Sequence, residues 1–211
     1  MKKFLYSSIL LLGVFGFTSC SETDSTTEEF GDWQNRNETY FSNIYQKAKA
    51  DTVNYKIIRS WSLEKDMATS PENNIVVQVL KVGTGSGCPL YTDSVRVHYE
   101  GRLIPSATYT GGYVFDKTWS GEYNLATMHP TTMSVSGLID GMVTALMKMH
   151  IGDRWKVYIP YQLGYGTTTS SSTSIPGYST LIFDLTLSSY YRMDTTVPDD
   201  QAKPFTGWVD D

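Results

Sequence analysis

Two polar side chains stand where packing alone gives them no obvious purpose. Asp116 directly follows Phe115 in a short apolar stretch, and Tyr165 lies between two glycines. In a water-poor pocket, a carboxylate and a phenol could hold a negative charge and a hydrogen-bond donor against a ligand, because fixed polar groups act most strongly there. Tyr99, Phe115 and Phe183 could line such a pocket, or they could simply be core residues of a β fold.

Other chemistry is sparse in this sequence. No nucleophile stands with a matching base, and the spacing of His98, His129 and His150 is not that of metal ligands. The glycine-rich run at residues 83–87 lacks the lysine and the strand-to-helix context of a phosphate loop. The net charge is -5, and no basic cluster follows the N-terminal end. We therefore expect no metal, no cofactor and no nucleic-acid partner, since nucleic acids require a basic surface.

The elements that would position these side chains are mostly strands. Residues 75–82 are rich in β-branched side chains, and residues 95–101 alternate so that Tyr99 shares one face with two valines. Residues 155–160 and 180–187 repeat the alternation. The pattern predicts half-buried strands of one sheet.

One helix is expected to interrupt this series. Leu138, Met142, Leu146 and Met149 recur at the spacing of a single apolar stripe, and Gly152 stands where a helix C-cap belongs. Several strands with one helix predict an α+β domain in which the sheet wraps around that helix.

Four sequence blocks follow one another along the chain. They are residues 95–103, residues 115–118, residues 137–142 with 149–152, and residues 159–166 followed by 175–184. In this order they resemble the FKBP-type peptidyl-prolyl cis-trans isomerases, and the resemblance covers roughly residues 75–189. It implies a half-open antiparallel β-sheet wrapped around one short α-helix, with a shallow aromatic pocket between them.

The resemblance also implies a role for each matching side chain. Asp116 would place negative charge beside a twisting amide, and the Tyr165 hydroxyl and the Ile175 backbone N–H would hold substrate carbonyls. The catalytic residues carried over from the family are Asp116, Tyr165 and Phe115, and the substrate-binding residues are Tyr99, Val135, Leu138, Ile175 and Phe183.

The implied reaction is rotation about the amide bond before proline. Its barrier is about 18 to 20 kcal/mol, and uncatalysed exchange takes tens to hundreds of seconds. No bond breaks, so catalysis requires a desolvating apolar slot and fixed hydrogen bonds, without a covalent intermediate. The expected substrates are proline-containing polypeptides.

This sequence departs from the family pattern at the base of the pocket. Leu138 stands where the family usually has Trp, Ser134 and Ser174 replace residues that are commonly apolar, and only Tyr123 or Met133 could stand for a further pocket aromatic. Weakened turnover and weak binding of macrolides such as rapamycin are therefore expected.

The N-terminus has the layout of a bacterial lipoprotein signal. Two lysines precede an apolar stretch at residues 4–17, which is too short to span a bilayer comfortably, and Cys20 stands at the expected cleavage point. An ordinary signal peptide with an incidental Cys20 is the alternative. Cys20 is expected to carry lipid and to hold the protein on the membrane of the bacterial cell envelope, at the periplasmic or surface face of the outer membrane.

These patterns divide the chain into five expected parts. They are a signal peptide at 1–19, an acidic tether at 20–30, an N-terminal helical extension at 31–74, the isomerase-like domain at 75–189 and a loosely ordered tail at 190–211. Three functions remain open: an isomerase acting on exported proteins, a proline-peptide-binding chaperone with little turnover, and a surface lipoprotein that binds glycans or partners. Catalysed exchange of an Xaa-Pro peptide separates the first from the other two.

Overall fold

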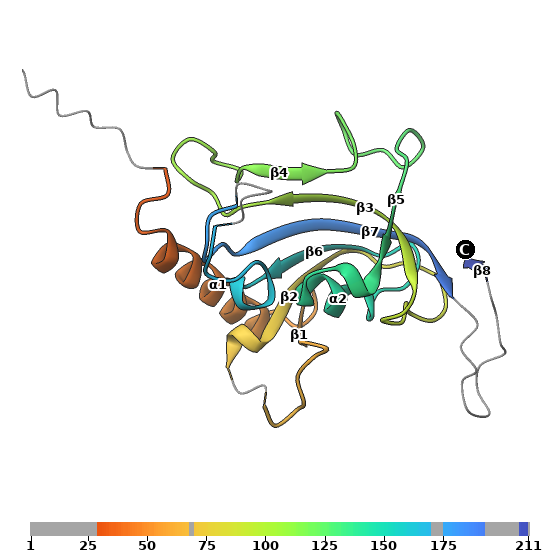
Figure 1. The fold of residues 1–211 in the computed structure, drawn as a ribbon, viewed down its shortest axis with the longest axis horizontal. Coiled ribbons are helices and arrows are strands. Elements are labelled where there is room, and N and C mark those ends of the chain that lie inside the picture. Colours follow the sequence, from red (N-terminus) through yellow and green to blue (C-terminus); the bar gives the residue numbers. More distant parts are fainter. Residues whose placement is uncertain (1–28, 68–69, 170–174, 193–206, 211) are drawn as a thin grey trace, which may run out of the picture.

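The computed structural model describes residues 29–67, 70–169, 175–192 and 207–210. Within these ranges the strands form one antiparallel sheet in the order β1-β2-β6-β7-β3-β4, with β5 also paired to β3 and β8 to β7 (Figure 1). The strands are β1 Tyr55–Arg59, β2 Asn74–Lys81, β3 Ser94–Arg102, β4 Val114–Lys117, β5 Thr131–Ser134, β6 Arg154–Ile159, β7 Leu181–Arg192 and β8 Gly207–Val209. The helices are α1 Trp33–Ala50 and α2 Asp140–Leu146, and 3₁₀ turns span Pro71–Asn73, Val135–Gly137 and Tyr161–Leu163.

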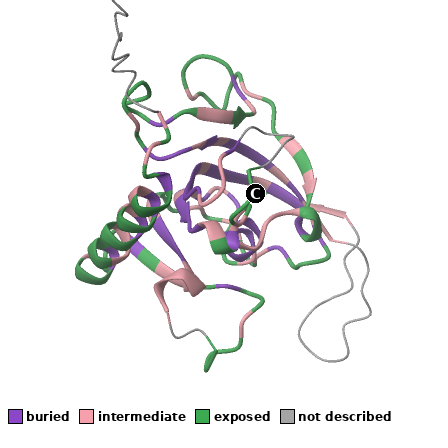
Figure 2. Cartoon of the chain, turned by 60° about the vertical axis from the view of Figure 1, so that its left-hand side comes forward, coloured by how far each residue is buried: buried purple, intermediate pink, exposed green. Residues whose placement is uncertain are grey.

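This arrangement confirms the predicted α+β fold. The sheet curves around α2, and the alternating apolar residues of β6 and β7 are buried along most of both strands (Figures 1 and 2). The prediction of a half-buried β3 was too simple, because His98, on the face opposite Tyr99, is also buried. A cavity behind β3 is lined by His98 together with Leu125, Met128 and Pro130, so the segment that leads into β5 lies against this face.

The helix around which the sheet curves is shorter than the apolar stripe predicted. It comprises Asp140–Leu146, so Leu138 precedes it and Met149 follows it in a turn. Gly152 has a φ of 87° but belongs to the turn before β6, so it does not cap the helix. The apolar stripe extends beyond the helix because residues in a turn can also direct apolar side chains into the core.

Close packing of α2 on the sheet depends on one glycine. A Cβ at Gly141 would lie 2.3 Å from Cγ2 of Ile159 on β6, closer than real Cβ atoms approach other carbons. The absent side chain lets the first turn of α2 approach β6 and places the residues around it at the edge of the sheet's curved face.

The N-terminal helix packs on the other face of the sheet. Tyr40 of α1 contacts Tyr158 of β6, with 6.5 Å between ring centroids, whereas Gly141 of α2 meets Ile159, the next residue along β6. Side chains of successive strand residues point to opposite faces, so the two helices sandwich the sheet. Trp33, Phe41 and Ala48 are buried, and the outer side of α1 is exposed (Figure 2).

The segments at both ends of the domain contain strands that the sequence pattern did not reveal. β1 follows α1 and pairs with β2, so residues 31–74 supply a sheet strand as well as a helix. β8 pairs with the end of β7, and the Arg96 guanidinium lies 3.8 Å from the Trp208 ring centroid. Cys20 and the expected signal peptide lie outside the described residues, among which no helix is long and apolar enough to cross a membrane.

Candidate active site

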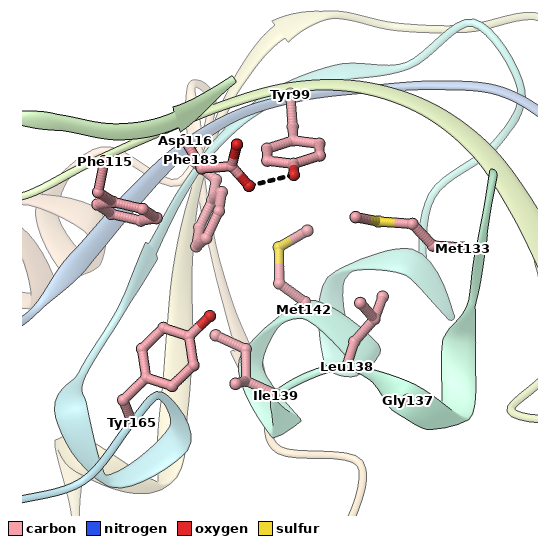
Figure 3. A pocket seen from close by; sticks show the side chains of 10 residues that line it. All are labelled: Tyr99, Phe115, Asp116, Met133, Gly137, Leu138, Ile139, Met142, Tyr165 and Phe183. Atoms are coloured by element: carbon pink, nitrogen blue, oxygen red, sulfur yellow. Dashed lines mark hydrogen bonds between the residues drawn. The ribbon is translucent and has the colours of Figure 1, made fainter. Parts of the chain in front are cut away.

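A cavity of about 210 Å³ opens between α2 and the sheet (Figure 3). Its lining residues come from four strands, from the segment that runs from the 3₁₀ turn after β5 into α2, and from the loop after β6. They are Tyr99, Phe115, Asp116, Met133, Gly137, Leu138, Ile139, Met142, Tyr165 and Phe183.

One side of the cavity, here named the strand wall, consists of Tyr99 on β3, Phe115 and Asp116 on β4, and Phe183 on β7. The Phe183 ring centroid lies 6.1 Å from that of Tyr99 and 5.7 Å from that of Phe115. These tilted and edge-to-face arrangements are favourable for aromatic pairs. The strand register therefore produces a continuous aromatic surface.

A glycine behind the strand wall makes this surface possible. Gly101 of β3 pairs with Phe183 on one side and with Asp116 on the other. A Cβ at this position would lie 2.6 Å from the Phe115 ring and 2.8 Å from the Phe183 ring. The two rings consequently lie over the backbone of β3, where no other residue would leave room for them.

Asp116 is held in place by the hydroxyl of Tyr99. The Tyr99 O–H donates to Oδ2 of Asp116 at 2.5 Å, drawn as the dashed line in Figure 3. Burial raises the pKa of Tyr99, and the hydrogen bond to Asp116 and its charge raise it further. The phenol therefore stays protonated and fixes one carboxylate oxygen, while Asp116 as a whole remains exposed.

Tyr165 reaches the cavity from the opposite direction. It follows the 3₁₀ turn after β6, is 41% exposed, and directs its hydroxyl toward the cavity (Figure 3). Burial of the ring raises the pKa of Tyr165, and the negative charge of Asp116 raises it further. The hydroxyl therefore remains a donor well into the alkaline range, and no side chain among the described residues is hydrogen-bonded to it.

The remaining side of the cavity, here named the non-aromatic floor, consists of Met133, Leu138, Ile139 and Met142. These residues lie on one continuous segment that leaves β5, passes through the 3₁₀ turn and enters α2. Figure 3 shows Leu138, Ile139 and Met142 below the strand wall and Met133 beside it. The cavity thus has an aromatic side that carries the polar groups and a floor of flexible aliphatic and thioether chains.

Comparisons with known proteins agree with this geometry. Residues 88–188 match the model of the family described as FKBP-type peptidyl-prolyl cis-trans isomerase. The macrophage infectivity potentiator of Trypanosoma cruzi is 35% identical over 179 residues, which cover 85% of this chain and 80% of that protein. The chain belongs to the FKBP-type isomerase family. The FKBP-type 22 kDa peptidyl-prolyl cis-trans isomerase of Escherichia coli is 34% identical over 68% of this chain.

The FKBP relatives also include longer proteins. The chain spans 61% of the Escherichia coli 22 kDa isomerase and 41% of FkpA from Aeromonas hydrophila. The crystal structure of Escherichia coli FkpA superposes with a TM-score of 0.53 at 26% identity and covers 75% of this chain and 61% of that one. An isomerase structure from Pseudomonas syringae, at 21% identity and the same TM-score, covers 75% of this chain and 96% of that one and shows the shared fold.

The FKBP pocket gathers most, but not all, of the side chains expected from the sequence. Tyr99, Phe115, Asp116, Leu138, Tyr165 and Phe183 line it together. Val135 is 0% exposed and Ile175 is 1% exposed, and neither lines the cavity. The Val135 N–H donates to the Asp93 carbonyl at 3.0 Å, which ties this residue into the core behind the floor.

Several pocket residues were not assigned from the sequence. Of the two candidates for a further pocket residue, Met133 lines the cavity, whereas the Tyr123 hydroxyl pairs with Thr186 on β7. Ile139 and Met142 also line it, and the apolar stripe already contained Met142. In the described part of the chain, no three His, Cys, Asp or Glu side chains gather as a metal site would require.

Proposed function

We propose that this protein is a peptidyl-prolyl cis-trans isomerase that acts on Xaa-Pro bonds of exported proteins from a lipid anchor at the bacterial cell envelope. The observation that carries the proposal is the pairing of Asp116 with Tyr99 at the edge of an aromatic cavity, opposite the hydroxyl of Tyr165. Family membership supports the reaction class, and the cavity offers an aromatic slot with polar groups at its edge.

The reaction requires a binding slot for proline and a polar edge for its amide. The proline ring would enter between Tyr99, Phe115 and Phe183, which exclude water from the amide. A twisted amide has lost its resonance, so its stabilisation depends on an environment complementary to the twisted state. A barrier lowered by about 5 kcal/mol would accelerate exchange several-thousand-fold.

The two polar groups would act on opposite ends of the bound peptide segment. Asp116, oriented by Tyr99, would place its free carboxylate oxygen beside the twisting amide. The Tyr165 hydroxyl, whose pKa is raised by partial burial and by the charge of Asp116, would donate to a substrate carbonyl. Groups held in position before the reaction need no reorganisation as the amide rotates.

The non-aromatic floor supports a second candidate function. Leu138 offers less flat contact area to a proline ring than the Trp usual in the family, so the chain could retain proline peptides with little turnover, as a chaperone would. The same loss of area predicts weak binding of macrolides such as rapamycin.

The proposed cellular location is supported by the sequence before the described residues. Cys20 follows an apolar stretch and precedes a polar tether, which favours lipidation. A 35% identical relative from Legionella longbeachae bears the name outer membrane protein MIP. We expect Cys20→Ala to release the protein into the soluble fraction or leave it unprocessed. Mass spectrometry of the mature protein that finds an unmodified Cys20 would contradict the anchor.

Exchange NMR on a proline-containing tetrapeptide tests the activity directly. The full chain, kept soluble with detergent, should accelerate cis-trans exchange of the peptide at catalytic concentrations. Peptide binding without acceleration would select the chaperone function, and the absence of both binding and acceleration would reject both. Phe183→Ala, which opens the strand wall, provides the matched inactive control.

A further inference from the structure

The first half of α1 makes specific polar contacts with residues that lead into β7. The indole N–H of Trp33 donates to Oγ of Ser179 at 2.9 Å. The backbone N–H of Thr180 donates to Oδ1 of Asn37 at 2.7 Å, and the Thr180 hydroxyl donates to the Asn37 carbonyl at 3.3 Å. Three hydrogen bonds thus join one helical turn to two adjacent residues that lie more than 140 positions later in the chain.

Asn37 is at the centre of this junction and is 0% exposed. Its Nδ2 donates to the Trp33 carbonyl at 2.7 Å, so the amide oxygen must face Thr180. A buried amide costs free energy unless its groups are paired, and both groups of Asn37 are paired here. Asn37 therefore holds Thr180 in one position, which a residue with an apolar side chain would not do.

The segment fixed by Asn37 is connected in turn to Tyr165 of the pocket. The backbone N–H of Tyr178 donates to the Gly166 carbonyl at 2.9 Å, and Gly166 directly follows Tyr165. Tyr178 has a φ of 63°, a strained value for a residue with a side chain, which persists only where its surroundings impose it. The Tyr161 ring packs edge-on against that of Tyr178 with 5.1 Å between centroids.

Between these residues the backbone at Gly177 passes very close to the backbone at Thr167. A Cβ at Gly177 would lie 2.1 Å from the Thr167 carbonyl oxygen, so the two sides of the loop touch just beside Gly166. A displacement of residues 178–180 would therefore be transmitted to residues 165–167. Figure 1 shows α1 beside the segment that follows β6.

We infer that Asn37 is a positioning residue for the reaction. Through Thr180 and Tyr178 it fixes the loop that holds the Tyr165 hydroxyl over the cavity, although Asn37 itself does not line that cavity. The helix α1 is accordingly a part of the active-site architecture in addition to a packed element of the fold. The inference rests on the proposed function of the pocket.

A double-mutant cycle in the full chain tests the inference. Exchange of a proline tetrapeptide is measured for wild type, Asn37→Ala, Tyr165→Phe and the double variant. Because small misplacements of a polar group cost activity, Asn37→Ala should lower kcat/KM about five- to tenfold in wild type. In the Tyr165→Phe background the same change should cost less than about twofold, since the hydroxyl that it positions is absent.

Matched variants separate positioning from general stability. Asn37→Leu keeps the volume but loses both hydrogen bonds, and it should resemble Asn37→Ala. Asn35→Ala changes an exposed asparagine on the same helix and should have no effect. Ala48→Gly weakens the far end of α1, where the side chain is also buried, and should lower the melting temperature without changing kcat/KM at 10 °C.

Amide NMR gives a readout that does not depend on turnover. Asn37→Ala should shift the resonances of Tyr165 and Gly166 and speed their hydrogen exchange, while those of Phe115 and Asp116 stay unchanged. If wild type lacks activity, the proposed function fails and this NMR comparison alone decides the positioning role.

Three results would overturn the inference. They are wild-type kcat/KM in Asn37→Ala, equal losses in both backgrounds of the cycle, and unchanged amide resonances at Tyr165 and Gly166. Should Asn37→Ala fail to fold, Trp33→Phe serves in its place, because it retains a ring but removes the donor to Ser179. The same non-additivity with Tyr165→Phe is then expected, at about a twofold loss in the wild-type background.

Discussion

The strand wall and the non-aromatic floor enclose the same cavity but are built differently. The wall takes its four side chains from three neighbouring strands, and the ladder of β3 with β4 and β7 fixes where each one lies. The floor takes its four side chains from one segment that changes from strand to 3₁₀ turn to helix between Met133 and Met142. The wall contains rings with two rotatable bonds each, whereas a methionine has three and adapts to its neighbours.

This difference separates two tasks within the site. The rigid wall holds Asp116 and a slot of fixed width, so it should determine whether the amide is twisted. The adaptable floor supplies contact area without fixed shape, so it should determine how tightly and how selectively a peptide is held. Changes in the wall should therefore cost turnover, and changes in the floor should alter affinity.

The largest effect is expected from a methyl group added to the wall. Gly101→Ala would force the Phe115 and Phe183 rings off β3, with a stability loss of about 1 to 3 kcal/mol typical of overpacking and a loss of kcat/KM of at least about tenfold. Gly137→Ala, directly before Leu138 of the floor, is the matched control, because its Cβ would meet nothing within 4 Å. Urea unfolding and peptide exchange measure both, and equal losses in the two variants would erase the distinction between wall and floor.

A smaller effect, confined to turnover, is expected from the polar edge of the wall. Asp116→Ala removes an exposed carboxylate, so stability should change little, but kcat/KM should fall about tenfold or more through the loss of one preorganised group. Tyr99→Phe keeps the ring and frees the carboxylate, and an intermediate loss is expected. Wild-type exchange rates in Asp116→Ala would remove this residue from the mechanism.

The wall is also the part of the site that sequence reasoning predicted well. Alternation along β3 and β7 identified the face of Tyr99 and Phe183, because a strand has a fixed two-residue period. The family pattern then identified Phe115 and Asp116 of the wall and, on the opposite side of the cavity, Tyr165, which is distant from them in sequence. The fold class followed from the same strands and one helix.

The floor and the edges of the sheet were predicted less well, for physical reasons. Turns lack a fixed period, so the apolar stripe could not show that Leu138 lies before α2, and the family pattern could not show that Val135 turns into the core. β1 and β8 have only five and three residues, too few for a periodic signal. The hydrogen bonds of Asn37 join residues far apart in sequence, and nothing in its neighbours' types indicates such a partner.

A modest gain is expected from a ring added to the floor. Leu138→Trp would add flat contact area worth on the order of 1 to 2 kcal/mol at about 25 cal/mol per Å², provided that Met133 and Met142 move aside. Proline-peptide exchange and rapamycin affinity should both rise by several-fold. Unchanged values in a variant with wild-type melting temperature would mean that Leu138 does not contact the proline ring.

The smallest effect concerns the opposite side of β3, behind the wall. His98 is 3% exposed, and its burial lowers its pKa, with a further decrease from His129 nearby. The unfolded chain therefore binds this proton more readily than the folded one, so the free energy of unfolding should decline as the pH falls below about 6.5. One group can contribute a slope of at most about 1.4 kcal/mol per pH unit.

His98→Asn should reduce that slope while leaving the pocket intact. Urea unfolding between pH 7.5 and pH 5 measures the slope, and above pH 7.5 wild type and variant should show parallel pH profiles because the histidine is then neutral in both states. Peptide exchange at pH 7.5 should match wild type, since Tyr99, the next residue along β3, points to the cavity and His98 points away from it. An equally steep decline in His98→Asn would assign the acid sensitivity to other groups, and a loss of exchange at pH 7.5 would show that the strand wall depends on the residues packed behind it.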